Sequence, residues 1–483
     1  MYTLRQRGEL ILLMGLFLLS FFPKTYRIDE PVADWHSWRQ ADTAAVTRNF
    51  IKEGFTPLFP KFDSYYALNE TGAPNPNRYF FAEFPLYNSI TYPLYRMFGV
   101  HELYARLISI VVSSLTTLVL YLLVKKRSGM GMALLAAIFY AILPYNWFYG
   151  RVILADPLYI LFSVTTLYLV TVWNKDSSKI ALFAGSIAWS LALLTKPYAL
   201  VLALPIAYLF YERLKFRMVT NPLPYLFAVL ALVPFFLWRY HINQYPEGMF
   251  GTTWLYNQGN IRFTGAYFRW LIFDRMNRLI FATGGFILFV LGIAATKIKQ
   301  ESLFYLTWLA AIAVYFVIIA KGNVTHDYYQ MPLVPVGCIF MASAVLFLVK
   351  QAHGLLQKMW VVGITLTLIM ITVAFGWYEI RGYFNINHPE IVDAGRAVDE
   401  LTPKDAKVIA PYEFDSAFLY QTNRYGWTIG GDKIPEFIKQ GATYLVSVNF
   451  DDTTNYWKSR CETVAQTQTW ILIDLTRCSS VES

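Results

Sequence analysis

Long apolar runs separated by short polar connections dominate the first part of the chain, up to about residue 378. A transmembrane helix needs roughly 20 mostly apolar residues. Candidate runs, several of them short, lie at about 8–22, 104–124, 130–148, 157–173, 180–195, 198–211, 223–240, 279–296, 302–320, 329–350 and 359–378. The pattern therefore predicts a polytopic α-helical membrane protein with about 11 transmembrane helices. Because Arg5 and Arg7 precede the first run and no small-residue cleavage pattern follows it, we expect an uncleaved anchor there.

Basic residues in the short connections predict the orientation of the spans. If the 11 spans alternate, 14 Lys and Arg residues of the N-terminus and the short connections fall on one side. The positive-inside rule makes that side cytoplasmic. Segments 23–103 and 241–278 and everything after residue 379 then lie on the exterior side.

Polarity rises sharply after Tyr378 and divides the chain into a membrane bundle, residues 1–378, and an exterior domain, residues 379–483. In that domain the spacing of "PEIVDAGRAVDEL" predicts a helix, and "DKIPEFIKQG" predicts another that ends at Gly441. The segments "AKVIA", "TYLVSV" and "TWILIDL" are typical of short buried strands. We therefore expect a small exterior α/β domain.

The first exterior loop, residues 23–103, is long enough to indicate a function of its own. Its pattern predicts a helix from Arg39 to Lys52 that Gly54 closes, and a second, proline-broken helix in "EFPLYNSITYPLYRMFG". Both helices are too short and too polar to span, so we expect them to lie along the membrane surface. Between them, "NETGAPNPN" is expected to form a turn-rich tip.

Composition supports a membrane protein and argues against nucleic acid as a partner. The chain has 56% hydrophobic and only 15% charged residues, whereas soluble domains have about 25% charged residues. Much of the net charge of +9 lies in the cytoplasmic connections, and no basic, aromatic-interleaved soluble stretch stands out. In the exterior domain, Cys461 and Cys478 can form a disulfide in an oxidising compartment, or remain two separate thiols.

Asp42 is the first candidate for chemistry, because it shares a helix face with Arg39 three residues before it. A carboxylate there can act as a general base or hold a metal ion, or it can simply pair with Arg39 on a solvated face. Spacing does not rank the other acids of the loop, which are Asp29, Glu30, Asp34, Asp63 and Glu83. No metal motif of dependable spacing is present, so a divalent cation remains open.

Further candidates lie at the exterior ends of the predicted spans. Asp156 follows Arg151 by five residues, and it either serves a function at membrane depth or caps its helix ahead of a proline. Lys196 interrupts an apolar run, where it can bind an anionic group or extend its amine to the interface. His326 and Tyr329 open the tenth span, and a lone His at such a place is more often structural than catalytic.

Five motifs, in order, resemble those of a known family: "TRNFIKEG", "EFPLYNSITYPLYRMFGVHELYARL", "LADPLYILF", "LALLTKPYALVLALP" and "HDYYQMPLVP". They resemble the polyprenyl-phosphate-dependent glycosyltransferases of the GT-C superfamily, in the branch of the bacterial lipid A aminoarabinose transferases and the protein O-mannosyltransferases. The resemblance covers the bundle from the first loop to the tenth span. It implies a GT-C fold in the bacterial inner membrane, with the active site on the periplasmic or extracellular side.

Two departures from the family pattern bear on the site. The family usually begins the first-loop helix with an Asp-Glu pair, where this chain has Arg39 and Gln40, and Asp42 lies nearly one turn further on. Glu83 stands where the aminoarabinose enzymes carry a lysine, so we expect sugar or acceptor selection to differ. The form "HSWRQADT" is similar to that of bacterial proteins labelled as core-oligosaccharide transferases.

The resemblance implies an inverting transfer of a sugar from a polyprenyl-phosphate donor to an acceptor hydroxyl on a glycan, lipid or protein of the cell envelope. Asp42 is expected to deprotonate the acceptor. Lys196 and Arg151 are expected to neutralise the donor phosphate, with Asp156 orienting one of them. The remaining substrate-binding candidates are Arg39, Glu83, His326 and Tyr329. No cofactor is assigned, and a requirement for a divalent cation remains open.

Two other classes of function remain open. A transporter or lipid flippase with an exterior accessory domain would place unusual polarity near mid-membrane, whereas here that polarity lies outside. A receptor or scaffold would leave Lys196 and Asp156 without a role. Trp35, Trp38 and His36 fit either sugar packing in an active site or anchoring at the membrane interface.

Overall fold

The structure is a computed structural model that describes residues 4–66, 72 and 74–479. It divides into two compact units, which we call the bundle unit and the α/β unit. Within the described residues, the bundle unit takes in Met1–Ile28, Arg106–Tyr240 and Thr252–Gly382. The α/β unit takes in Asp29–Ala105, His241–Gly251 and Tyr383–Ser483.

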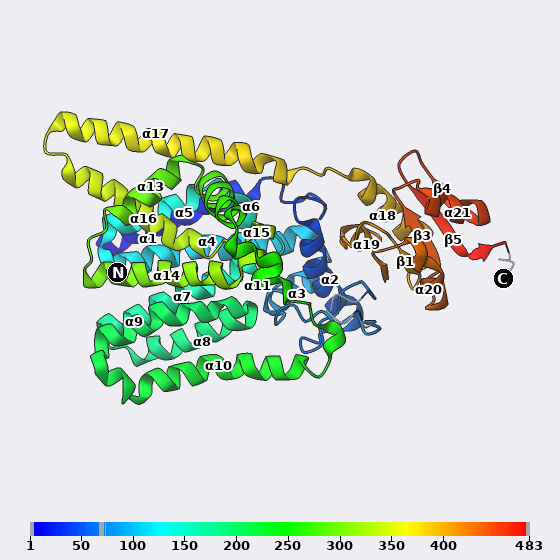
Figure 1. Ribbon diagram of the computed structural model, residues 1–483, viewed down its shortest axis with the longest axis horizontal. Coiled ribbons are helices and arrows are strands. Elements are labelled where there is room, and N and C mark those ends of the chain that lie inside the picture. Colours follow the sequence, from blue (N-terminus) through cyan, green and yellow to red (C-terminus); the bar gives the residue numbers. More distant parts are fainter. Residues whose placement is uncertain (1–3, 67–71, 73, 480–483) are drawn as a thin grey trace. The chain divides into compact units, whose positions relative to one another are not determined.

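The bundle unit is built of helices (Figure 1). Its longer helices are α1 (Leu4–Phe21), α4 (Glu102–Ser128), α5 (Met130–Ile142), α7 (Asp156–Asp176), α8 (Lys179–Thr195), α9 (Ala203–Leu214), α10 (Pro222–Ile242), α13 (Gly284–Ala294), α14 (Gln300–Ile318), α16 (Leu333–Gln351) and α17 (Leu355–Ile380). Short helical segments connect them, including η1 (Phe22–Thr25), α6 (Pro144–Tyr149), η2 (Pro197–Leu202), α11 (Trp254–Asn257), α12 (Gly265–Phe268), η6 (Arg269–Ile280) and α15 (Ala320–Thr325).

The polytopic helical fold is confirmed, but fewer helices reach full spanning length than the 11 predicted runs. Among the described residues, seven helices are long and apolar enough to cross a membrane, or eight if the bent pair Gly265–Ile280 and Gly284–Ala294 is one span. Helices α5 and α8 are apolar but shorter. Prolines explain where both end, because Leu143 and Lys196 are extended ahead of Pro144 and Pro197.

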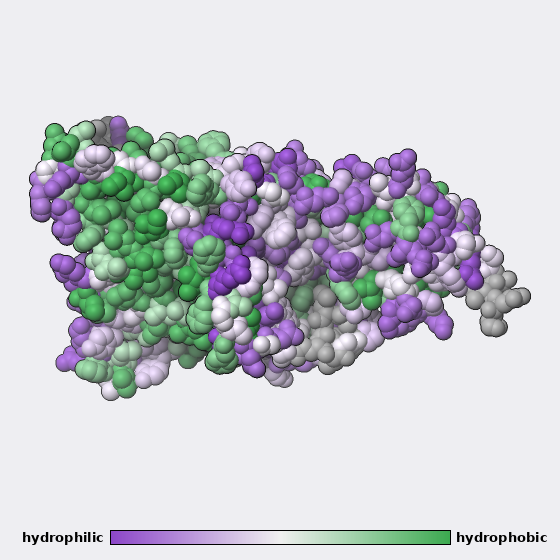
Figure 2. All heavy atoms as spheres, turned by 45° about the horizontal axis from the view of Figure 1, so that its top comes forward, coloured by the Kyte–Doolittle hydropathy of each residue, from purple (hydrophilic) through white to green (hydrophobic). Residues whose placement is uncertain are grey.

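Small residues let the helices of the bundle approach closely. A Cβ atom at Gly292 of α13 would lie 1.8 Å from the carbonyl oxygen of Phe340 in α16, and one at Gly284 would lie 2.2 Å from that of Leu368 in α17. Such contacts are typical of helices packed within a membrane. Figure 2 shows many apolar side chains on the surface of the bundle unit and mostly polar ones on the C-terminal part of the chain.

The C-terminal part of the α/β unit contains the predicted mixed fold. Its five-stranded sheet has the order β2-β1-β3-β5-β4, with β1 parallel to β2 and β3, and β5 antiparallel to β3 and β4. The strands are β1 (Lys407–Ile409), β2 (Tyr425–Trp427), β3 (Tyr444–Ser447), β4 (Cys461–Gln466) and β5 (Ile471–Cys478). The helices are α18 (Pro389–Leu401), α19 (Ala417–Gln421), α20 (Ile434–Lys439) and α21 (Asp452–Arg460). Cys461 and Cys478 form a disulfide between β4 and β5.

The first loop forms the two predicted helices, α2 (Ser37–Glu53) and α3 (Leu86–Phe98), and Gly54 ends α2 with a φ of 101°. The loop also extends the sheet, because Ser64 bridges in parallel to Gly426 of β2 and the backbone N–H of Tyr65 donates to the Gly426 carbonyl at 2.8 Å. The described loop residues therefore share one compact unit with residues 383–479, whereas the sequence-based division at residue 379 grouped them with the bundle. Part of the expected tip "NETGAPNPN" lies outside the described residues.

Candidate active site

Helix α2 positions Asp42 in a polar but buried environment. Residues 39–50 are all buried although many are polar. Ala41, Ala44 and Ala45 favour the helix and leave room for neighbours to approach. Helix α19 packs on α2, and Ser416, which precedes α19, donates to the carbonyl oxygen of Trp38 at 2.9 Å. This packing removes Asp42 from water.

The Asp42 carboxyl is 3% exposed and forms a side-chain hydrogen bond with Ser416. Its pKa is raised from 3.8 to about 7, mainly because burial disfavours the charged form. The charges of Asp415 and Asp63 act in the same direction as burial, while Ser416 and Arg39 lower the pKa. A general base works best when its pKa lies near the operating pH. Asp42 therefore has the protonation behaviour expected of a base at neutral pH.

Arg39 and Glu83, both predicted as substrate-binding residues, lie together. The Arg39 guanidinium donates to both carboxylate oxygens of Glu83 at 2.7 Å, with both side chains nearly buried. Arg39 also lies 5.1 Å from the centre of the Phe80 ring. Among the described residues, Asp42 has no ion-pair partner within 4.0 Å. The geometry thus directs Arg39 to Glu83, and Asp42 to Ser416.

Two other first-loop acids have partners that hold the α/β unit together. Asp63 pairs with Arg48 and accepts a hydrogen bond from Asn49 at 3.0 Å. Asp34 accepts from the Gln40 side-chain amide at 2.6 Å. Among the described residues, no group of three or more His, Cys, Asp and Glu side chains could hold a metal ion. A divalent cation would therefore need ligands beyond such a cluster.

In the bundle unit the structure joins two predicted residues 40 positions apart. Asp156 begins α7, and Lys196 is extended between the end of α8 and Pro197. The Lys196 ammonium lies 3.3 Å from a carboxylate oxygen of Asp156. Both residues are buried, with 7% and 5% of their surface exposed. The pair thus places the positive charge of Lys196, which the Asp156 carboxylate compensates, at the end of the candidate span α7.

A cluster of aromatic side chains begins close to Lys196 in the chain and includes the candidate residues His326 and Tyr329. The ring of Tyr198, two residues after Lys196, lies 5.8 Å from that of Tyr329 and 5.2 Å from that of Tyr315. The rings of Tyr329 and His326 are 5.4 Å apart. Sequence spacing placed these residues in separate motifs, and the bundle brings them together.

Arg151 is fully buried, and its guanidinium donates to the carbonyl oxygen of Arg27 at 2.6 Å. It also lies 5.5 Å from the centre of the Phe148 ring. This hydrogen bond ties the segment before α7 to the chain that follows α1. Arg151 therefore has a structural contact in addition to its predicted role toward a phosphate.

Sequence reasoning did not single out Asp327 or Ser416. Asp327 is 1% exposed, accepts a 2.5 Å hydrogen bond from the Tyr149 hydroxyl and lies 3.9 Å from Arg275. Its sequence signal was an acid beside His326 at the start of a candidate span. Ser416 gave no signal, because it is 374 positions from Asp42 in the chain.

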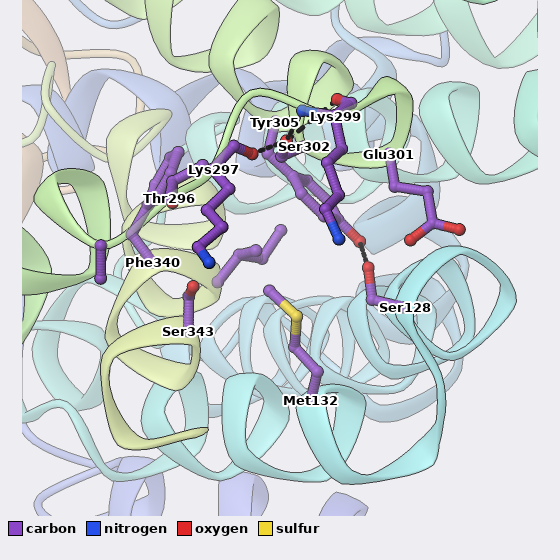
Figure 3. A pocket seen from close by; sticks show the side chains of 12 residues that line it. Ser128, Met132, Thr296, Lys297, Lys299, Glu301, Ser302, Tyr305, Phe340 and Ser343 are labelled. Atoms are coloured by element: carbon purple, nitrogen blue, oxygen red, sulfur yellow. Dashed lines mark hydrogen bonds between the residues drawn. The ribbon is translucent and has the colours of Figure 1, made fainter. Parts of the chain in front are cut away.

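The bundle unit also contains a cavity of about 300 Å³ (Figure 3). Lys297 and Lys299 line it, together with Ser128 and Tyr305, whose hydroxyls are 2.9 Å apart. Ser128 ends α4 close to the far end of α7, because Lys126 pairs with Asp176, the last residue of α7, at 2.7 Å. A helix of that length spans about 30 Å. The cavity therefore belongs to the opposite end of the bundle from Asp156.

Comparisons with known proteins agree with the predicted fold. Residues 84–241 match the family model described as dolichyl-phosphate-mannose-protein mannosyltransferase. The structure of ArnT from Cupriavidus metallidurans bound to undecaprenyl phosphate is similar with a TM-score of 0.68 and 15% identity, covering 96% of this chain and 98% of that chain. The archaeal oligosaccharyltransferase AglB from Archaeoglobus fulgidus, in complex with an inhibitory peptide and a dolichol-phosphate, has a TM-score of 0.58 and 11% identity, covering 92% of this chain and 70% of that chain. No curated protein matches the sequence. The predicted GT-C fold is confirmed.

Proposed function

We propose that this chain is a membrane glycosyltransferase that moves a sugar from a polyprenyl-phosphate donor to an acceptor hydroxyl. The observation that supports it best is the buried Lys196–Asp156 pair at the end of a candidate span, within the segment that matches the mannosyltransferase family model. The confirmed fold adds support, since ArnT is described with undecaprenyl phosphate and AglB with dolichol-phosphate.

Lys196 binds the phosphate of the donor in this proposal. A lysine ammonium is a compact positive charge that suits a phosphate oxygen, and it stabilises the negative charge that grows on the leaving phosphate. Asp156 orients the ammonium and compensates its charge when no donor is bound. The lipid chain of such a donor also explains why the binding residues stand on membrane helices.

Asp42 acts as the general base. It accepts the proton of the acceptor hydroxyl as the oxygen forms a bond to the anomeric carbon. The bond from that carbon to the phosphate oxygen breaks in the same step, and its electron pair leaves with the polyprenyl phosphate. A single displacement of this kind inverts the configuration at the anomeric carbon. Arg39 and Glu83 help bind the substrates, as do His326 and Tyr329.

We also propose that the reaction takes place on the exterior, periplasmic side of a bacterial inner membrane and modifies a cell-envelope glycan or lipid. The features supporting this orientation are the basic connections that the positive-inside rule assigns to the cytoplasm. Residues 379–483 then form an exterior domain, and α2 and α3 lie along the membrane surface.

The test is release of polyprenyl phosphate from a short-chain polyprenyl-phosphate sugar by the full-length protein in detergent, with a glycan supplied as the hydroxyl acceptor. Wild-type protein should release it, and Lys196→Met, which keeps bulk and removes the charge, should not. Lys179→Met is the matched control, because Lys179 is an exposed lysine at the other end of the same helix. The proposal fails if no donor is cleaved, or if Lys196→Met and Lys179→Met release product at the wild-type rate.

A further inference from the structure

A pocket of about 310 Å³ lies within the α/β unit, and the proposed steps at Lys196 and Asp42 do not use it. Residues 33–38, before and at the start of α2, supply part of its lining. The C-terminal part of the chain supplies Asn387, His388, Tyr412 and Asp415. The pocket is therefore made by two segments about 350 positions apart that fold into one unit.

The lining combines flat rings with a few hydrogen-bonding groups. Trp35, Trp38 and Tyr412 provide aromatic surface, and Asp415 and Asn387 provide a carboxyl group and an amide. Ligand pockets generally combine such apolar surface with a small number of polar groups that fix orientation. A pyranose ring needs both, because its C–H face is apolar while its hydroxyl groups donate and accept hydrogen bonds.

The first-loop side of the pocket is held in place before any ligand arrives. The Trp35 ring stacks on Tyr383 at 4.8 Å, and the Trp35 backbone N–H donates to the Tyr383 carbonyl at 3.0 Å. Gln40 donates to the Asp34 carboxylate at 2.6 Å and to the Trp35 carbonyl at 3.1 Å. A site fixed in this way loses little conformational entropy on binding. Trp35 nevertheless remains 43% exposed, so its surface is accessible.

The opposite lining is fixed around Asp415. Its carboxylate accepts a 2.7 Å hydrogen bond from the backbone N–H of Ala417 and a further one from the Ser37 side chain. The two preceding residues, Glu413 and Phe414, both have positive φ, of 49° and 68°. Such conformations are costly for residues other than glycine and tend to occur at binding and active sites.

Two of the residues that line the pocket lie close to Asp42. Trp38 precedes Asp42 by four residues, which puts the two on the same face of α2 about one turn apart. On the other side, Asp415 is followed by Ser416, which forms the side-chain hydrogen bond with Asp42. A molecule in the pocket thus lies close to the proposed base.

We propose that this pocket binds a sugar residue of the acceptor, so that the acceptor is a glycan. The inference rests on the proposed function, since it assigns the acceptor for the step at Asp42. The sugar packs against Tyr412 and the Trp rings, while Asp415 and Asn387 hydrogen-bond its hydroxyls. A metal ion is a poorer occupant, because the described residues provide no group of three His, Cys, Asp or Glu ligands.

Sugar binding can be measured without donor or turnover. The full-length protein in detergent is titrated with the methyl glycosides of glucose, galactose, mannose and N-acetylglucosamine, and tryptophan fluorescence is followed. At least one glycoside should change the fluorescence saturably, since two Trp residues line the pocket. Tyr412→Ala should weaken that binding by about tenfold through loss of a ring contact, and Asp415→Asn should weaken it by a similar factor.

Two further variants show whether weaker binding comes from loss of the Tyr412 ring or from damage to the fold. Tyr412→Phe keeps the ring and should bind within a few-fold of wild type. Tyr456→Ala removes an exposed Tyr of the same unit, on α21 outside the pocket, and should bind as wild type does. The proposal is overturned if wild-type protein responds saturably to none of the glycosides, or if Tyr412→Ala and Asp415→Asn bind as tightly as wild type.

The failure of this inference differs from the failure of the proposed function. If the protein binds a glycoside but never releases polyprenyl phosphate, sugar transfer is refuted and the assignment of the pocket as a sugar site stands. Protein that transfers sugar with an unchanged acceptor KM in Tyr412→Ala and Asp415→Asn would refute the pocket and leave transfer standing.

Discussion

The replacement Asp42→Asn tests whether Asp42 is a catalytic base or a purely structural carboxyl group. The two roles predict opposite effects of the replacement on the stability of the protein. Asn keeps the size of the side chain and a hydrogen bond to Ser416, and removes the ionisable group. The folded-state pKa of Asp42 is raised from 3.8 to about 7. The folded state therefore binds this proton more tightly than the unfolded chain does, so the wild-type stability falls as pH rises from about 4 to about 7.

The size of this effect follows from the pKa change. Holding a carboxylate with that pKa ionised in the folded protein costs up to about 4 kcal/mol of unfolding free energy above pH 7. The Asp42→Asn variant avoids the cost, so it should be more stable than wild type at about pH 8 and about equally stable near pH 4. Turnover should move the other way and fall by about 10²–10⁴-fold.

The assay combines polyprenyl phosphate release with thermal unfolding of the same detergent-purified samples at several pH values. Wild-type turnover should rise about tenfold per pH unit below pH 7 and level off above it, because the base must be unprotonated. Asp432→Asn, at an exposed acid of the α/β unit, is the control and should change neither property. An Asp42→Asn protein that turns over normally, or that unfolds more easily than wild type at pH 8, would refute the role of Asp42 as a buried base.

Further predictions concern the other charged groups and the disulfide. Lys196→Arg should retain part of the donor affinity that Lys196→Met loses, because Arg keeps the charge in a different geometry; lipid-phosphate binding measures both. Glu83→Gln should lower the unfolding free energy by about 3 kcal/mol, since it removes the negative charge from a nearly buried ion pair, and a thermal melt that matches wild type would count against it. Replacing both Cys461 and Cys478 by Ala should cost about 3 kcal/mol relative to the disulfide-bonded wild type, measured by denaturant unfolding, and reduced wild type should lose a similar amount. Asp451→Ala should leave turnover unchanged, because the C-terminal part does not supply the base, and a strong loss of rate in folded protein would contradict this.

Much of the fold is local and was therefore predictable. Apolar runs mark the helices of the bundle, and the polar stretch that Gly54 ends gives α2 almost to the residue. Strands β2 and β4 were not predicted, because β2 has three residues and β4 is largely exposed, so neither has a continuous apolar run. Spanning length was overestimated at α5, because hydropathy counts apolar residues and not the break at Leu143 and Pro144.

The candidate site was predictable as a set of residues and not as a set of contacts. Asp156 and Lys196 were singled out because charges are unusual where they stand, and Asp42 because it shares a helix face with Arg39. The hydrogen bond between Asp42 and Ser416, and the ion pair between Lys196 and Asp156, join positions far apart in the chain, which spacing cannot detect. The pocket beside Asp42 is likewise invisible in sequence, because Tyr412 and Asp415 meet Trp35 only through folding.

The most direct test of sugar transfer follows both products of one reaction. A polyprenyl-phosphate donor with a radiolabelled sugar is incubated with wild-type protein and a lipid-free glycan acceptor, and polyprenyl phosphate and labelled water-soluble glycan are measured together. The account predicts that the two appear in equal amounts and that both are lost in Asp42→Asn. If the label stayed on the lipid phosphate with every acceptor offered while the lipid itself changed sides in vesicles, the chain would be a lipid transporter and the account would be contradicted.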